Sequence, residues 1–250
     1  MTEPRRVVIE SAYLLHQRPF RETSRILDFF ARDHGRISLF VRGARRTGAG
    51  LGALLQPFRP LLICWSGKPD GGTLRSAEVQ EAVTPLAPAR LMSGFYLNEL
   101  LLRLLERQDA HPALFDAYAL AVARLRDGED EARALRLFEK RLLEEMGYGV
   151  DYTADARSGE PVTAGRYYQV RPHQGVCRVA EPSDSPYVFA GEHLLSIASD
   201  ELRDSASLRA ARRLLRAALD ESLDGRELLS REVAVAIRRH ETDSREGGKQ

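Results

Sequence analysis

Cysteine is scarce in this chain of 250 residues, which contains only Cys64 and Cys177. Two cysteines cannot form the disulfide framework of a small secreted domain, and they fall short of a four-cysteine zinc site. Cys64 lies in the apolar run LLICW, which predicts a buried free thiol. The chain also lacks an apolar run of about 18 residues that could span a membrane, and its first residues lack the apolar core of a secretory signal. These absences predict a cytoplasmic protein with no membrane partner.

The sequence motifs of common enzyme classes are missing as well. The segment Gly43–Gly50 has the two glycines of a phosphate-binding loop, but Ala49 and Gly50 replace the required lysine and hydroxyl residue. Neither a nucleophile elbow nor a His-Glu-x-x-His zinc motif is present. His173 and Cys177 are close in sequence, but a zinc site needs two further ligands. The sequence therefore predicts a protein that is not an enzyme and holds no metal or cofactor.

Lysine is nearly absent, so the 37 basic residues are almost all arginines, and the net charge is only +1. The charge is unevenly distributed along the chain. Residues 1–60 hold 11 arginines and 5 acidic residues, a local charge of +6, so the remainder carries −5. The excess centres on the strip Arg18–Arg46, where arginines alternate with apolar residues. A locally basic surface is typical of a protein that binds the phosphate backbone of nucleic acid.

Residues 6–82 contain five short runs of β-branched, aromatic or alternating residues, which predict strands. The runs are VVIESAYLL, RILDFF, RISLFVR, PLLICW and TLRSAEVQEAV. Turn signals occur at Arg18-Pro19, at His34-Gly35 and at residues 68–72, and His34-Gly35 predicts a hairpin of the second and third strands. The small-residue segment GAGLGALLQP predicts a short helix after the third strand. This pattern matches a five-stranded OB-fold barrel, with an SH3-like barrel as the alternative.

The apolar period becomes helical after residue 88. A leucine stripe predicts a first helix through about residue 105. Pro112 suits the first position of a second helix, and a third helix is expected to run from about residue 131 to a glycine cap at Gly147 or Gly149. Further helices are predicted at about 192–199, 205–222 and 226–239.

Residues 148–190 break this helical period and predict an irregular insertion with short strands at 167–170 and 176–179. We therefore predict an α+β protein. Its expected parts are an OB-fold domain at 1–83, a mostly helical domain at 84–240 that includes the insertion, and a disordered tail at 241–250.

The third predicted strand supplies the centre of a candidate nucleic-acid site. Alternation places Ile37, Leu39 and Val41 on the core face and leaves the intervening residues on the outer face. On the outer face two arginines bracket Phe40, and such a ring stacks on a base for about 1–3 kcal/mol while arginines neutralise phosphates. An alternative for Phe40, packing beneath the helical domain, stays open. The predicted binding residues are Arg18, Arg21, Arg36, Phe40, Arg42, Arg45, Arg46 and Arg75.

Several blocks of the chain, in order and at consistent spacing, are similar to one bacterial family. The blocks are Arg18-Pro19-Phe20-Arg21-Glu22-Thr23-Ser24, Val41-Arg42-Gly43-Ala44-Arg45, Leu55-Gln56-Pro57-Phe58, Leu74-Arg75-Ser76-Ala77-Glu78, Gly94-Phe95-Tyr96-Leu97-Asn98-Glu99-Leu100, and Phe138-Glu139 through Gly147-Tyr148-Gly149. Together they resemble the RecO family of recombination mediators over nearly the whole chain, to about Arg239.

The resemblance implies an N-terminal OB-fold and a helical domain in a cytoplasmic, nucleoid-associated protein. It also implies binding of single- and double-stranded DNA, annealing of complementary strands, and cooperation with RecR in loading RecA onto DNA covered by single-strand-binding protein. Many family members carry a four-cysteine zinc module after Gly-Tyr-Gly, but residues 151–179 here contain one cysteine. The chain therefore resembles the metal-free proteobacterial branch, and zinc is expected to be absent.

In that branch the helical domain binds the acidic, hydrophobic C-terminal tail of single-strand-binding protein. Such a tail requires an apolar groove flanked by cations. The third predicted helix offers Arg133, Arg136, Leu137, Lys140 and Arg141. Arg136 matches the family's basic position best, and the others are inferred from helical proximity. A solvated helix face, in which Glu139 and Glu144 pair with these cations, is the alternative.

Two other classes of function stay open from the residues alone. An RNA-binding OB-fold protein would use a similar basic face and would also contact the 2′-hydroxyl. An adaptor that binds only proteins would show no salt-dependent oligonucleotide binding. The resemblance favours DNA repair over both.

Overall fold

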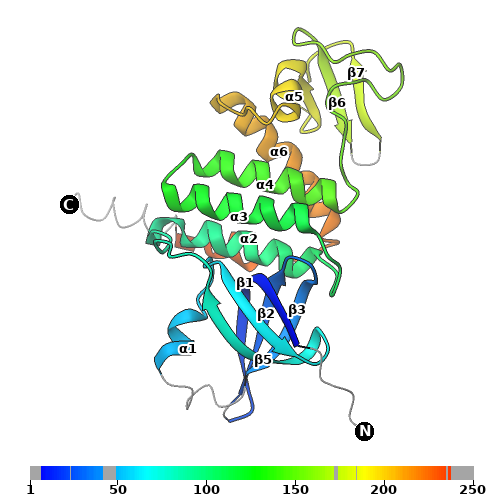
Figure 1. Ribbon diagram of the computed structural model, residues 1–250. Coiled ribbons are helices and arrows are strands. Elements are labelled where there is room, and N and C mark those ends of the chain that lie inside the picture. The colour runs from blue at the N-terminus through cyan, green and yellow to red at the C-terminus, as the bar shows by residue number, and fades with distance from the viewer. Residues whose placement is uncertain are drawn as a thin grey trace, which may run out of the picture. The chain divides into compact units, whose positions relative to one another are not determined.

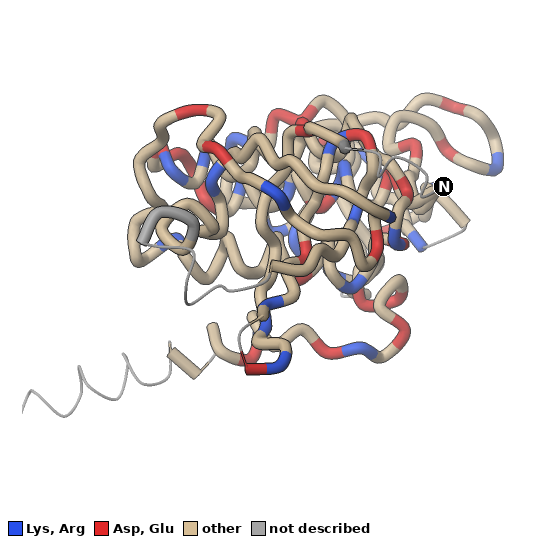
Figure 2. Tube along the Cα trace, turned by 60° about the horizontal axis from the view of Figure 1, so that its bottom comes forward, with Lys and Arg blue, Asp and Glu red and all other residues tan. Residues whose placement is uncertain are grey.

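The computed structural model describes residues 7–22, 24–41, 49–171, 174–183, 185–234 and 236–237. The chain divides into two compact units, the first combining Met1–Asp127 with Glu227–Gln250 and the second comprising Gly128–Arg226 (Figure 1). Basic and acidic residues are interspersed along the described chain (Figure 2).

The first unit begins with a closed barrel whose strand order is β1-β2-β3-β5-β4. Its strands are β1 (Val7–Phe20), β2 (Ser24–Ala31), β3 (Gly35–Val41), β4 (Leu61–Ser66) and β5 (Asp70–Val79). Strands β3 and β5 pair in parallel, whereas the other neighbours pair antiparallel. The short helix α1 (Ala49–Leu54) lies between β3 and β4 in the chain. The predicted α+β architecture with an N-terminal OB-type barrel is confirmed.

Alternation along the strands fills the barrel interior as predicted. Ile37, Leu39 and Val41 are buried in the core, at most 5% exposed. The same rule corrects the expectation of a buried thiol at Cys64. Its neighbours on β4, Ile63 and Trp65, point inward and are fully buried, so Cys64 points outward and is only partly covered.

One predicted turn is misplaced. Arg18-Pro19 lies inside β1, where Pro19 pairs with Arg25, and the hairpin turn follows at Arg21 and Glu22. Proline is tolerated near the end of a strand, where a missing N–H removes little pairing. The hairpin predicted at His34-Gly35 is confirmed, since β2 and β3 pair antiparallel across a turn that ends at Gly35 with φ of 64°.

Helices α2 (Leu91–Leu104) and α3 (Pro112–Asp127) lie together over one end of the barrel, after the short 3-10 turn Pro88–Arg90 (Figure 1). A chain of buried hydrogen bonds joins α3, α2 and strand β1. The Tyr118 hydroxyl donates to Asn98 Oδ1 at 2.6 Å, and Asn98 Nδ2 donates to the Leu15 carbonyl of β1 at 2.9 Å. Burial also raises the pKa of Tyr118 well above its ordinary value. A satisfied buried chain of this kind defines how the helices seat on the barrel.

The second unit contains α4 (Glu131–Glu145), α5 (Gly191–Ala198), α6 (Ser205–Ser222) and a three-stranded sheet of order β7-β6-β8. The strands are β6 (Tyr167–Arg171), β7 (Gly175–Val179) and β8 (Val188–Ala190). Helix α4 starts where the Asp130 carboxylate accepts the Arg133 N–H, and Gly147 follows its end with φ of 82°. Strand β8 has only three residues, which is too short for an alternating sequence pattern to predict it.

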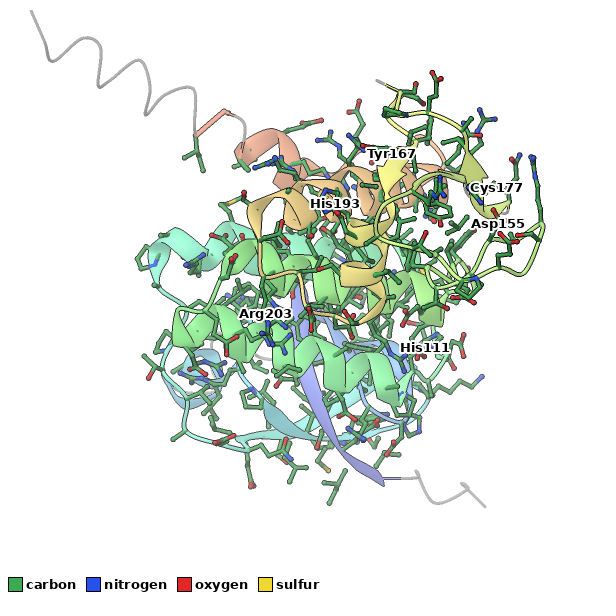
Figure 3. All side chains as sticks on the ribbon, turned by 90° about the horizontal axis from the view of Figure 1, so that it is seen from above. His111, Asp155, Tyr167, Cys177, His193 and Arg203 are labelled. Atoms are coloured by element: carbon green, nitrogen blue, oxygen red, sulfur yellow. The ribbon has the colours of Figure 1, made fainter. Side chains whose placement is uncertain are left out.

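The insertion of the second unit is organised by a carboxylate. Asp155 Oδ1 accepts the N–H groups of Arg157 at 2.8 Å and Ser158 at 3.0 Å, while Oδ2 accepts the N–H of Arg178 at 2.5 Å. The last bond ties the loop to β7, next to Cys177 (Figure 3). These hydrogen bonds, that from Arg178 first, lower the pKa of Asp155 to about 2.

We expect Asp155→Asn to lower the free energy of unfolding at neutral pH, because the amide turns an N–H group toward a backbone donor. The folded-state pKa of Asp155 lies below its unfolded value, so its stabilisation is complete above about pH 4 and is lost as the pH falls towards 2. The difference between variant and wild type should therefore shrink across this window. Urea unfolding at several pH values measures it, with Glu181→Gln as the matched control; a difference that does not change with pH would contradict the assignment.

Candidate nucleic-acid interface

Cross-strand pairing places a row of side chains on the outer face of the barrel. Arg18 pairs with Ile26, Ile26 with Phe40, and Phe40 with Thr73. Residues directly opposite one another share a face of the sheet. Thr73 is in turn opposite Ser66, whose hydroxyl accepts a hydrogen bond from Arg75 Nε at 2.7 Å. The row therefore runs across the barrel wall with an arginine at either end.

Phe40, in the middle of this row, forms an aromatic pair with Phe20. The rings of Phe20 and Phe40 have centroids 5.2 Å apart and are tilted by 52°. The Arg21 guanidinium lies 5.2 Å from the centroid of the Phe20 ring. Phe40 thus packs against Phe20 of β1, which is a different contact from either one considered in the sequence analysis. Phe20 was missed there because β1 was predicted to end before it.

The three arginines of this surface, Arg18, Arg21 and Arg75, are exposed. We call them, with Phe20 and Phe40, the barrel surface. Exposed guanidinium groups around partly covered rings can neutralise phosphates and stack bases without reading base identity. The sequence had predicted four of these five residues.

Arg36 lies away from the barrel surface. Its guanidinium donates to the Leu102 carbonyl at the end of α2, and its own carbonyl accepts the Gln108 N–H at 3.0 Å. Burial, followed by the neighbouring charge of Arg107, lowers the pKa of Arg36. The segment after α2 covers this end of β3 closely, because a Cβ at Gly35 would lie 1.7 Å from the Asp109 carbonyl oxygen. Arg36 joins the barrel to α2.

A neighbouring row of outward-facing residues on the barrel is polar, and its positive charges are paired with carboxylates. Arg107 donates to Ser38 Oγ at 3.1 Å and to Asp70 Oδ1 at 2.5 Å, and Ser38 donates to Asp28. His16 Nδ1 lies 3.7 Å from Asp28 Oδ2. The two carboxylates in this row make it a poor phosphate site, so the outer face of the barrel divides into a compensated row and the barrel surface.

Some predicted residues lie outside those that the structure describes. They are Arg42, Arg45, Arg46, His173 and the tail at 241–250.

The predicted partner-binding residues of α4 are engaged within the second unit. Arg133 donates to the carbonyls of Glu201 and Asp200, both at 2.8 Å. Lys140 bonds Asp200 Oδ1 at 2.6 Å and the Ala198 carbonyl at 3.2 Å. Cations at these carbonyls complement the negative end of α5. Arg133 and Lys140 therefore hold α4 to the end of α5.

Arg136 and Arg141 pair with carboxylates of their own helix. Arg136 Nη2 lies 2.5 Å from Glu139 Oε1, and the two side chains are only 10% and 1% exposed. Arg141 lies 3.3 Å from Glu144 and 2.8 Å from Glu145, with 42% of its side chain exposed. The fifth predicted residue, Leu137, is partly buried. Arg141 is thus the more accessible cation of this pair.

Within the described ranges, no three His, Cys, Asp or Glu side chains gather in a way that could hold a metal ion. No helix in the described part of the chain is long and apolar enough to cross a membrane.

Two family matches together cover most of the chain. The family described as "Recombination protein O N terminal" matches residues 6–83, and "Recombination protein O C terminal" matches residues 86–232. This chain belongs to the RecO family. The predicted membership is confirmed, and the RecO family acts as a recombination mediator in DNA repair.

Relatives from several bacteria are similar over most of both chains. The DNA repair protein RecO of Cupriavidus metallidurans is 41% identical over 234 residues, which cover 93% of this RecO-family chain and 78% of the relative. That of Actinobacillus pleuropneumoniae serotype 3 is 42% identical over 222 residues (88% and 92%), and that of Yersinia pestis is 43% identical over 226 residues (90% and 92%). These RecO proteins support a DNA-repair role for the chain.

Proposed function

We propose that this RecO-family protein is a non-enzymatic mediator that binds single- and double-stranded DNA and anneals complementary strands. With RecR, it helps to load RecA onto DNA covered by single-strand-binding protein, in the cytoplasm at the nucleoid. The observation that carries the proposal is the barrel surface, where three exposed arginines share the outer face of the barrel with the Phe20–Phe40 pair.

The annealing mechanism follows from charge. Two complementary strands repel each other through their phosphates, and guanidinium groups that neutralise phosphates lower this repulsion. The Phe20–Phe40 pair lies where bases of a bound strand can stack, and stacking tolerates any sequence because every base has a π-face. Helix α1, inserted between β3 and β4, carries no charged or polar side chain with which to read a base edge. Binding without base-specific readout suits a factor that anneals arbitrary sequences.

The partner part of the proposal rests on α4. We assign the acidic tail of single-strand-binding protein to the side of α4 that carries Leu137 and Arg141. Arg141 has the exposed fraction that a peptide carboxylate needs, whereas Arg136 and Lys140 are only 10% and 12% exposed in their side chains. The structural role of the other cations, Arg133, Arg136 and Lys140, is then to hold α4 in place, and they are not the first contacts of the tail.

Strand annealing in the presence of single-strand-binding protein tests the whole proposal. The protein is expected to anneal complementary oligonucleotides that are bare or coated with intact single-strand-binding protein, and to anneal coated strands more slowly when the coat lacks its C-terminal tail. Annealing is followed by fluorescence energy transfer between end-labelled strands. Absence of salt-dependent binding would support a protein-only adaptor instead, and strong preference for a matched RNA oligonucleotide would support an RNA-binding function.

A further inference from the structure

Helix α6 of the second unit carries an arginine stripe that the proposed function does not use. Its members are Arg209, Arg212, Arg213 and Arg216, and all four are exposed. Their spacing of three and four residues places them on one helix face. The opposite face is the buried one, formed by Ser207, Ala210, Ala211, Leu214, Leu215 and Leu219. The stripe is therefore a solvent-facing line of positive charge.

Folding does not account for this charge. Arg209 and Arg212 have no hydrogen-bond or ion-pair partner among the described residues. Arg216 has one ion pair, with Asp220 at 3.6 Å, and Arg213 donates to the Val188 carbonyl at 2.8 Å. Like charges at this spacing repel each other and slightly destabilise a helix. The cations of α4 are compensated within the unit, whereas those of α6 mostly face water.

The dimensions of the stripe suit a nucleic-acid strand. The first and last arginines are seven positions apart, which corresponds to about 10 Å along a helix that rises 1.5 Å per residue. A stripe of this length is long enough to contact more than one phosphate of the same strand.

An exposed aromatic residue lies next to the stripe. Arg213 is held by the Val188 carbonyl and lies 4.4 Å from the centroid of the Phe189 ring. Tyr187 directly precedes this strand and is 39% exposed. It also lines a cavity of about 270 Å³, together with Phe189 of β8 and Leu214 of α6. A ring and an apolar hollow beside guanidinium groups are the elements that hold single-stranded nucleic acid.

We propose that the arginine stripe of α6, with Tyr187, is a second binding surface for single-stranded nucleic acid, distinct from the barrel surface. Arginines bind consecutive phosphates, and Tyr187 stacks a base of the same strand. The inference rests on the proposed DNA-annealing function and deepens it, because one chain with two such surfaces binds two strands at once.

The test uses the full-length chain and short oligothymidylate, titrated by fluorescence anisotropy at several salt concentrations. The wild type is expected to bind two oligonucleotides per chain, and R209Q/R212Q should bind the second oligonucleotide more weakly. The variant should also lower the slope of log affinity against log salt at this site by about 1.4, which is 0.7 for each of two lost phosphate contacts on a single strand. R157Q/R166Q removes two exposed arginines of the same unit outside α6 and is expected to behave as wild type.

Two further variants separate the explanations. Tyr187→Ala should weaken the second binding event without changing its salt slope. R209K/R212K should keep the second binding event of the wild type, because phosphate binding needs the positive charge. If R209Q/R212Q titrates as wild type while the barrel variant R18Q/R21Q/R75Q loses binding, α6 is not a nucleic-acid surface and the proposed function stands. If neither variant changes binding, both proposals fail. If R209Q/R212Q loses only binding to an acidic peptide, α6 is a protein-docking surface and the inference is overturned.

Discussion

The barrel variant R18Q/R21Q/R75Q is expected to bind single-stranded DNA on the order of 100-fold more weakly than wild type at about 50 mM salt. Each lost phosphate contact removes about 0.7 from the slope of log affinity against log salt, so three arginines should remove about 2. The side chains are exposed, and within the described ranges only Arg75 of the three donates a hydrogen bond through its side chain, so the fold should be unaffected. Fluorescence anisotropy over a salt series measures both quantities.

The charge-retaining variant R18K/R21K/R75K is the matched control and should keep the wild-type salt slope. Stacking is tested separately by Phe40→Ala, which should reduce affinity by an amount that does not depend on salt. Salt curves of the glutamine variant that run parallel to those of wild type would place the phosphate contacts elsewhere.

Arg136→Ala should lower the free energy of unfolding by about 3–5 kcal/mol, because it breaks a buried ion pair and removes the guanidinium group that lies against the buried Glu139 carboxylate. The pair joins Arg136 Nη2 and Glu139 Oε1 at 2.5 Å, and both side chains are almost fully covered. Arg141→Ala on the same helix should cost less than about 1 kcal/mol, since its ion pairs are partly exposed to water. Urea unfolding followed by circular dichroism measures the free energy of unfolding of both variants.

The double variant R136M/E139L provides a second measurement on the same pair. Apolar residues of similar size in place of a buried ion pair are often neutral, so the double variant should recover most of the lost stability. Equal stability of Arg136→Ala and wild type would show that the pair contributes little. If the single variant is destabilised as expected, weaker tail binding by it reports on folding, and Arg141→Ala is the sharper test of tail contact.

The elements that could be predicted from sequence are those with a local cause. Alternation of apolar side chains identified Ile37, Leu39 and Val41 as core because inward residues of a barrel strand recur every second position. Asp130 and Gly147 mark the ends of α4 because capping is decided within a few residues. Residues whose partners are distant in sequence could not be assigned in the same way.

Phe20 and Arg36 illustrate the difference. The ring of Phe20 belongs to the barrel surface because it meets Phe40, twenty positions further along the chain. Arg36 had the same alternation as Phe40 but bonds the Leu102 carbonyl, a residue of the helical region. Strand periodicity states which face a side chain takes and contains no information about what will cover that face.

The amino-acid sequence by itself determined the RecO family, the OB-type barrel, the helical elements and the arginine-rich N-terminal strip, because these depend on local pattern and on order along the chain. Only the tertiary structure decided which arginines are available to a ligand. Arg18, Arg21 and the α6 stripe remain exposed, whereas Arg36, Arg133, Arg136 and Lys140 are bound to carbonyls or carboxylates. A guanidinium group is free or engaged according to what folding brings within hydrogen-bond distance, and that distance is set by residues far away in the sequence.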